Sequence, residues 1–297
     1  MDCRHTLVKI YLFVCRRYRH HVRAAAQRQS NNCEPDFTDK EVLTVYLFGI
    51  IEKCRTVSEI HRYAAEHFSE WFPDLPSYQS YSRRLNRMSA VFAPLIAEAV
   101  DEIECSETQA EVMRIADSMP ITMAKQKRSS SAKVASDEIA NKGYCASKDT
   151  HFYGVKMHVV AEHRSGRLPL PGRVSLTPGS EHDLTALRQA LPRITGGQLY
   201  GDKAYCDGLM KERLLDDQSL EVLTPVKKKR GQDHLSAADK LFSEVISKVR
   251  QPIESLFNWI DEKTGIQCAS KVRSYQGLLV HAFGRLAAAM LLLSFNP

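Results

Sequence analysis

No Cys-x-x-Cys pair occurs in this chain of 297 residues, although it holds eight cysteines. That absence argues against a zinc knuckle, and the scattered spacing is typical of reduced thiols in a cytoplasmic protein. No small-residue cleavage site follows the apolar residues 6–15, which argues against a signal peptide. His281 and Arg285 interrupt the apolar segment 277–295, which therefore predicts a buried C-terminal helix instead of a membrane span.

What is present is the composition of a globular protein with one large domain or two modest ones, 43% hydrophobic and 26% charged. The net charge of +6 is unevenly distributed. Residues 1–30 contain seven Lys/Arg and one acid, and residues 227–230 form a second basic cluster. Either cluster alone is typical of a solvated surface, but two of them flanking a candidate acidic site favour a nucleic-acid partner.

The first hundred residues predict a series of short helices. Thr38 and Thr56 have the sequence context of helix N-caps, each followed by helically spaced apolar residues. A third, basic helix is predicted at 80–88, with Arg83 and Arg84 in it. This pattern is typical of helix-turn-helix units and of ordinary bundles alike, so both interpretations stay open.

From residue 111 the pattern changes to short apolar runs. We predict strands at 111–117, 152–162, 173–176, 198–201 and 221–225, helices at 181–194 and 209–217, and a helical remainder. Pro120 is expected to end the first strand, and residues 124–150 are expected to form a mobile loop. The order β-β-β-α-β-α-β-α indicates a mixed α/β sheet with helices on its faces.

Two of these predicted strands end in an aspartate, Asp117 and Asp202. Sites in α/β sheets form where strands end at a crevice. One such acid could be a helix cap, but two indicate a metal site, since close carboxylates repel unless a cation lies between them. Glu254 is the candidate third acid, on a helix predicted to begin near Pro252. A solvent-facing glutamate is the alternative for Glu254.

These acids lie in motifs that can be compared with known proteins: IADSMPI with Asp117, YGVKMH with Lys156 and His158, PGSEHD at 178–183, GDKAY at 201–205, and Arg250-x-x-x-Glu254. Their order and spacing resemble bacterial insertion-sequence transposases of the Asp-Asp-Glu class, most of all the family named for insertion sequence nine-eighty-two. DKEVLTVYLFG and YQSYSRRLNRM in the N-terminal part are also similar to that family, so the resemblance covers most of the chain.

The resemblance implies an RNase H-like catalytic domain at 109–297, with Asp117, Asp202 and Glu254 as catalytic metal ligands, after an N-terminal DNA-binding region at 1–108. It implies two Mg²⁺ ions, replaceable by Mn²⁺. The expected partner is double-stranded DNA, as element ends and target, held by a homodimer on paired ends. No membrane and no small-molecule substrate are expected, and the expected location is the bacterial cytoplasm, at the nucleoid.

Candidates for DNA contact are Lys156, His158, Lys203, Arg250, Lys227, Lys228, Lys229, Arg230, Arg83 and Arg84. For His158 a hydrogen-bonded core histidine is the favoured alternative, and for Lys203 plain charge compensation is an equal one. His182 and Asp183 are expected to cap a helix.

Two residues near Glu254 depart from the family pattern. Ser247 stands where relatives often have tyrosine, and Asp261 stands where they often have lysine. Pro252 is expected to keep Arg250 off the helical face of Glu254.

The expected function is a DNA transposase that cleaves at the terminal inverted repeats of its own insertion sequence and transfers the strand, without a covalent link between protein and DNA. Two alternatives share the same acidic residues. One is an RNase H-like nuclease without strand transfer, and the other is an inactive DNA-binding relic or repressor.

Overall fold

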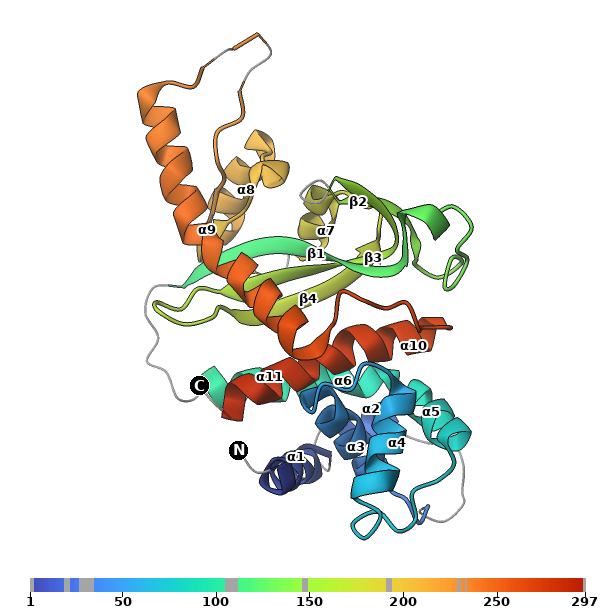
Figure 1. Ribbon diagram of the computed structural model, residues 1–297. Coiled ribbons are helices and arrows are strands. Elements are labelled where there is room, and N and C mark those ends of the chain that lie inside the picture. Colours follow the sequence, from blue (N-terminus) through green and yellow to red (C-terminus); the bar gives the residue numbers. More distant parts are fainter. Residues whose placement is uncertain are drawn as a thin grey trace. The chain divides into compact units, whose positions relative to one another are not determined.

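The chain divides into two compact units in the computed structural model shown in Figure 1. One unit combines Met1–Glu107 with Ile260–Pro297, and the other is Thr108–Trp259. Residues 260–297, which the sequence analysis placed in the second domain, therefore group with the N-terminal helices. The structure describes residues 3–18, 22–26, 35–104, 112–145, 149–190, 194–228, 231–232 and 234–295.

The regular elements in the described part of the first unit are helices. Its elements are α1 (Cys3–Arg17), α2 (Arg23–Ala26), α3 (Asp39–Ile51), α4 (Val57–His67), α5 (Tyr78–Arg87), η2 (Ser89–Val91), α6 (Phe92–Glu104), α10 (Tyr275–Leu279), the π-helical turn η7 (Val280–Gly284) and α11 (Arg285–Phe295). The three predicted N-terminal helices are confirmed as α3, α4 and α5. A role for them in DNA binding stays a prediction.

The predicted caps at Thr38 and Thr56 are confirmed. Thr38 Oγ1 accepts the backbone N–H of Glu41, whose carboxylate accepts the N–H of Thr38 at 2.6 Å, which completes a capping box. Thr56 Oγ1 accepts the N–H of Glu59 at 3.1 Å. These local bonds explain why both helices begin where the sequence predicts.

The predicted buried C-terminal helix is also confirmed. In the part of the chain that the structure describes, Tyr275–Phe295 is the single helical segment long and apolar enough to cross a membrane, yet 67% of its apolar window is buried inside the protein. It packs against α3 and α6 of the same unit. Tyr46 of α3 donates a hydrogen bond to the Val280 carbonyl at 3.0 Å. This segment is the core helix of the unit.

The second unit is built on a mixed sheet. Its strands are β1 (Met113–Lys125), β2 (Asn141–Cys145), β3 (Thr150–Glu162), β4 (Leu170–Pro178), β5 (Gly197–Tyr200) and β6 (Leu220–Leu223), in the spatial order β2-β3-β1-β5-β6 with β4 also on β3. β1, β3 and β4 are antiparallel neighbours, whereas β5 and β6 run parallel to β1. The predicted mixed sheet is thereby confirmed.

Helices lie on both faces of this sheet. Ala116 of β1 belongs to an apolar cluster with Leu187 of α7 (Asp183–Ala190) and Leu214 of α8 (Gly208–Gln218). Side chains alternate along a strand, so Asp117 points to the opposite face. There it meets α9 (Ala237–Thr264), which crosses the sheet in Figure 1. Apolar side chains are buried on both faces, with Ile115 and Met119 on the same face of β1 as Asp117, which lies beneath α9.

The expectation that Pro120 ends the first strand is wrong, because β1 continues to Lys125. Proline has no backbone N–H, and a central strand needs its N–H groups to pair with the strands on both of its sides. β1 pairs with β5 only at residues 113–115, so at Pro120 its one partner in the sheet is β3. β1 is locally an edge strand there, and an edge strand tolerates proline.

Two further expectations differ from the structure. The segment 124–150, predicted as a mobile loop, contains the short helical turn η3 (Gln126–Arg128) and strand β2. β2 is too polar to recognise from its pattern, since its one buried residue is Gly143. The helix predicted to begin near Pro252 begins at Ala237, and Pro252 lies inside it.

Candidate active site

Asp117 and Asp202 are brought to the same level of the sheet by the pairing of β1 with β5. Ile115 is the parallel partner of Tyr200, so the two aspartates lie two residues beyond a matched pair on neighbouring strands. Neighbouring strands are about 4.8 Å apart. Asp202 follows the end of β5 as expected, whereas Asp117 lies within β1 and not at its end.

The Asp202 carboxylate has a second, local role as the N-cap of the short turn η6 (Lys203–Tyr205). Its Oδ1 accepts the backbone N–H of Ala204 at 2.7 Å. The cap that the sequence left open as an alternative is therefore present, and it orients the carboxylate at the end of β5. Capping occupies one oxygen and leaves the other for a ligand.

Asp117 is a largely buried carboxylate. Burial raises its pKa, the Arg250 guanidinium and the N–H of Ser118 lower it, and the charge of Asp202 raises it again. The net effect is a pKa above the ordinary value. The nearby positive charge of Arg250 therefore compensates only part of the cost of keeping Asp117 ionised.

Arg250 of α9 joins Asp117 to Glu254. Its Nη2 lies 3.0 Å from Asp117 Oδ2 and 3.9 Å from Glu254 Oε1, one helical turn further on. The expectation that Pro252 keeps Arg250 and Glu254 on different faces is thus wrong, because the helix continues through the proline. The Glu254 side chain is 63% exposed, and it approaches Asp117 only through the guanidinium.

Lys156 and His158 lie together on the α7 side of the sheet, around an acid that the sequence analysis treated as a helix cap. Asp183 Oδ1 accepts hydrogen bonds from Lys156 Nζ at 3.2 Å and from Ser118 Oγ at 3.1 Å. His158 Nδ1 is 3.9 Å from the same oxygen. Asp183 could have been found from the motif PGSEHD, but only the tertiary structure brings it to Ser118: the β1–β3 register pairs Ser118 with His158, and the start of α7 lies next to both.

His158 is a hydrogen-bonded core histidine, the alternative that the sequence analysis favoured. Its Nε2 shares a 2.7 Å hydrogen bond with Thr177 Oγ1. Burial lowers its pKa to about 4, although Asp183 acts in the opposite direction. The ring is neutral at physiological pH.

The low pKa of His158 predicts a loss of stability in acid. An unfolded histidine binds a proton near pH 6.5, so the stability from His158 is complete above that pH and is lost as the pH falls towards 4. At pH 5 the loss should be about 2 kcal/mol. Urea unfolding at pH 7 and pH 5 measures it, and His158→Gln should remove this part of the pH dependence. An unchanged pH dependence in the variant would contradict the prediction.

The remaining predicted DNA contacts are spread over both units. Lys203, Lys227 and Lys228 are exposed, the first directly after Asp202 and the others after β6, while Lys229 and Arg230 lie outside the described residues. On α5, Arg83 is exposed. The neighbouring Arg84 is held by Asp39, with Nε 2.8 Å from Oδ1, and by the Phe37 carbonyl.

The two departures from the family pattern bond within their own surroundings. Ser247 Oγ donates to the Ser243 carbonyl at 2.7 Å, and Asp261 Oδ1 accepts the N–H of Gln267 at 2.9 Å. Both hydrogen bonds are short-range in sequence, and neither involves Asp117, Asp202 or Glu254. Their roles here are local to the helix and to its C-terminal turn.

A mixed sheet with helices on its faces and two level aspartates fits the RNase H-like catalytic fold. Comparison with protein families matches residues 107–274, more than half of the chain, to the family described as "Transposase DDE domain". The chain belongs to this family, and its class of activity is DNA transposition and recombination. Neither a curated protein nor a solved structure matches the chain. The narrower family of insertion sequence nine-eighty-two stays a prediction.

Transposases with this domain generally use divalent metal ions. Among the residues that the structure describes, no three His, Cys, Asp or Glu side chains are gathered closely enough to hold one. The donors nevertheless fit in kind, because Asp117 and Asp202 offer hard carboxylate oxygens at one level of the sheet. The guanidinium of Arg250 already forms an ion pair with Asp117. The buried Nε of Arg250 has no hydrogen-bond partner within the described part of the chain.

Proposed function

We propose that this transposase binds the terminal inverted repeats of its own insertion sequence, cleaves the DNA there in a metal-dependent reaction and transfers the freed strand. The observation that carries the proposal is the level placement of Asp117, on β1 beneath α9, and Asp202, directly after the parallel strand β5. A buried carboxylate with a raised pKa next to a second acid is typical of functional sites.

Asp117, Asp202 and Glu254 would hold the divalent ions, Mg²⁺ or Mn²⁺. When bound, such ions activate the attacking hydroxyl and stabilise the leaving oxygen of a phosphodiester. Asp202 is already oriented by its cap on Ala204, whereas the exposed Glu254 has to turn towards the aspartates. Arg250 has to leave Asp117, and its guanidinium then becomes free to contact a DNA phosphate.

Exposed lysines in the same unit as this site support DNA as the partner. Lys203 adjoins Asp202, and Lys227 and Lys228 follow β6. Lysines placed in this way would bind the phosphate backbone without reading sequence. Such a protein would act at its DNA substrate, in the bacterial cytoplasm at the nucleoid.

A homodimer on paired ends is supported by apolar side chains on the first half of α9. Leu241, Phe242 and Val245 are 64%, 42% and 50% exposed. Large apolar side chains grouped on an exposed helix mark interaction surfaces. We propose that they pack against a second copy of the chain.

The test is incubation of the purified protein with labelled element-end DNA, with Mg²⁺, with Mn²⁺ and with a chelator. The expected result is metal-dependent nicking at the element boundary, followed by joining of the new 3′ end to target DNA. Cleavage without joining would show a nuclease without strand transfer. Binding without cleavage in either metal would show an inactive relic or repressor.

Removing the guanidinium from the site should tighten metal binding. Arg250→Gln abolishes the charged contact with Asp117, worth about 2 kcal/mol, so the apparent Kd for Mn²⁺ should fall by about tenfold or more. Calorimetric titration of DNA-free protein with Mn²⁺ measures it. Arg213→Gln is the control, because Arg213 is an exposed arginine on α8 of the same unit. Equal Kd values in both variants would show that Arg250 does not compete with the metal.

A further inference from the structure

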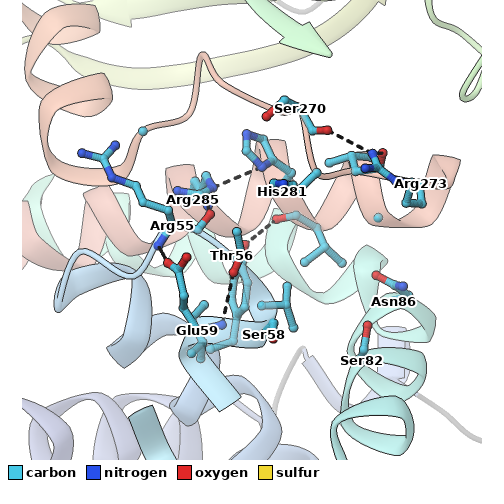
Figure 2. A pocket seen from close by; sticks show the side chains of 18 of the residues that line it. Arg55, Thr56, Ser58, Glu59, Ser82, Asn86, Ser270, Arg273, His281 and Arg285 are labelled. Atoms are coloured by element: carbon cyan, nitrogen blue, oxygen red, sulfur yellow. Dashed lines mark hydrogen bonds between the residues drawn. The ribbon is translucent and has the colours of Figure 1, made fainter. Parts of the chain in front are cut away.

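A large cavity lies within the helical unit and takes no part in the site described above. Its volume is about 850 Å³. Three segments form most of its walls: residues 55–60 at the start of α4, one side of α5, and the stretch from Gly265 to Arg285. Tyr46 of α3 completes the lining. Figure 2 shows side chains from all three segments around the same space.

Positive charge dominates this cavity. Its lining has one carboxylate, Glu59, and four cationic side chains, which are Arg55, Lys271, Arg273 and Arg285. Glu59 is already occupied at the start of α4, where Oε2 accepts the N–H of Arg55 at 2.7 Å. Among the described residues, none of the four cations forms an ion pair with a carboxylate. The lining therefore carries more positive than negative charge, and the negative charges that act on it come from Glu59 and, on Arg285, from Asp261.

Arg285 is the buried member of this set. Its Nη2 donates to the Arg55 carbonyl at 2.6 Å, its Nη1 to the Thr264 carbonyl, and its Nε to His281 Nδ1 at 3.2 Å. His281 Nε2 donates to the Ile266 carbonyl at 2.9 Å, which leaves Nδ1 as the acceptor. Burial lowers the pKa of His281 to about 3, so the ring is neutral. All three partners of the guanidinium are therefore uncharged.

A second guanidinium converges on the same place. Gly265 has a left-handed φ of +67°, and a Cβ there would lie 2.7 Å from Arg55 Nη1 and 3.5 Å from Arg285 Nη1. Burial lowers the pKa of Arg285, and the positive charge of Arg55 lowers it further, as expected for two neighbouring cations. Bringing two like charges together costs free energy unless an anion joins them. The glycine leaves room for both groups at the cavity wall.

The rest of the lining suits an anion with several oxygen atoms. Ser58, Ser82, Asn86 and Ser270 supply hydroxyl and amide donors around the space, as Figure 2 shows. Val280 and His281 belong to the π-helical turn η7, a type of irregularity that is frequent at functional sites. Arg55, Lys271 and Arg273 are exposed, so they stand at the mouth where a long ligand would pass.

We propose that this cavity is a phosphate-binding site for a DNA strand, separate from the Asp117 and Asp202 site. The proposal rests on the proposed function in one respect, which is that DNA is the partner. The cavity is far larger than one phosphate group, and its cations are distributed from a buried floor to an exposed rim. Such a distribution suits successive phosphates of a backbone better than one small anion.

The first experiment measures binding of fluorescent duplex DNA to the full-length protein in EDTA, at several salt concentrations. EDTA removes the metal ions, so DNA binding is measured whether or not the protein cleaves DNA. Arg55→Gln combined with Lys271→Gln removes two rim cations, both exposed, so folding should be preserved. The matched control is Arg62→Gln, an exposed arginine of α4 that does not line the cavity.

The expected result is that DNA binding by the double variant depends less on salt concentration than binding by the wild type. The slope of log K against log salt should fall in magnitude by about 1.8 in the double variant, about 0.9 for each phosphate that the protein no longer neutralises. The control should keep the wild-type slope. If the double variant keeps it too while the wild type binds DNA, the cavity proposal is overturned and the proposed function stands. If the wild type binds no DNA, both are overturned.

A second measurement separates DNA from a small anion. Melting temperatures are compared in phosphate and in chloride at equal ionic strength, for the wild type and the double variant. A phosphate-specific rise in Tm that the double variant loses, together with an unchanged DNA slope, would assign the cavity to a free phosphate compound and overturn the DNA proposal. A reduced DNA slope with the control unchanged supports it.

Discussion

Asp202→Asn should lower the rate of metal-dependent DNA cleavage by at least about 10³-fold, which corresponds to ~4 kcal/mol of lost transition-state stabilisation. The reason is that the substitution removes a metal-binding charge at the level of Asp117. Single-turnover cleavage of labelled element-end DNA measures the effect. A rate within tenfold of the wild type would remove Asp202 from the catalytic set.

Asparagine is preferred to alanine here because Asp202 also caps η6. The amide oxygen of asparagine can still accept the N–H of Ala204, so the turn should be preserved while the charge is removed. A melting temperature close to that of the wild type checks this point. Asp216→Asn, at an exposed acid on α8, controls for the loss of one negative charge elsewhere in the unit. That control should cleave at the wild-type rate.

Arg285→Leu should destabilise the helical unit by about 3 kcal/mol or more. Arg285 is buried, with 4% of its surface exposed, and its guanidinium satisfies the carbonyls of Thr264 and Arg55 together with His281 Nδ1. Leucine leaves all three acceptors without this donor. The variant no longer has to bury a charge, and this offsets part of the lost stability. The expected destabilisation is therefore smaller than the sum of three hydrogen bonds.

The measurement has to report on one unit, because two units need not unfold together. The two tryptophans make this possible, since Trp71 lies in the helical unit and Trp259 in the sheet unit. In a Trp259→Phe background, urea unfolding followed by fluorescence reports on Trp71 alone. Lys271→Leu, at an exposed cation of the same cavity, is the control. A loss below about 1 kcal/mol would contradict the structural role of Arg285.

The two kinds of prediction test different parts of the molecule. Asp202→Asn tests chemistry on a preserved fold, whereas Arg285→Leu tests the wall of the cavity through the stability of its unit. If only Asp202→Asn has its expected effect, the proposed catalytic role stands and the structural role of Arg285 is wrong. If only Arg285→Leu has its expected effect, Arg285 stabilises the helical unit and the proposed catalytic set is wrong.

Local interactions made much of this structure predictable. The caps at Thr38 and Thr56 depend on residues three positions apart, so the helix starts followed from neighbouring residues. The mixed sheet followed from short apolar runs, and Asp202 was found because its run is short and ends in an acid. The burial of the C-terminal helix followed from its interrupting His281 and Arg285.

Pairing between distant segments decided the rest. β1 passes through Pro120 because β5 leaves it after residue 115, which no local pattern encodes. Asp183 meets Ser118 through the β1–β3 register and the start of α7, and Arg250 reaches Asp117 across 133 residues of chain. α9 runs through Pro252 because its neighbours in the fold outweigh one missing hydrogen bond.

The order of the amino acids was enough to indicate the transposase class, the mixed sheet and the three acids to examine, because motif order and helix or strand period are properties of neighbouring residues. Only the tertiary structure determined which cation lies next to each acid. It also brought Arg55 and Arg285, 230 residues apart, to the wall of one cavity. The physical reason is that charge, burial and hydrogen bonding at a site depend on distances through space, which chain spacing does not specify.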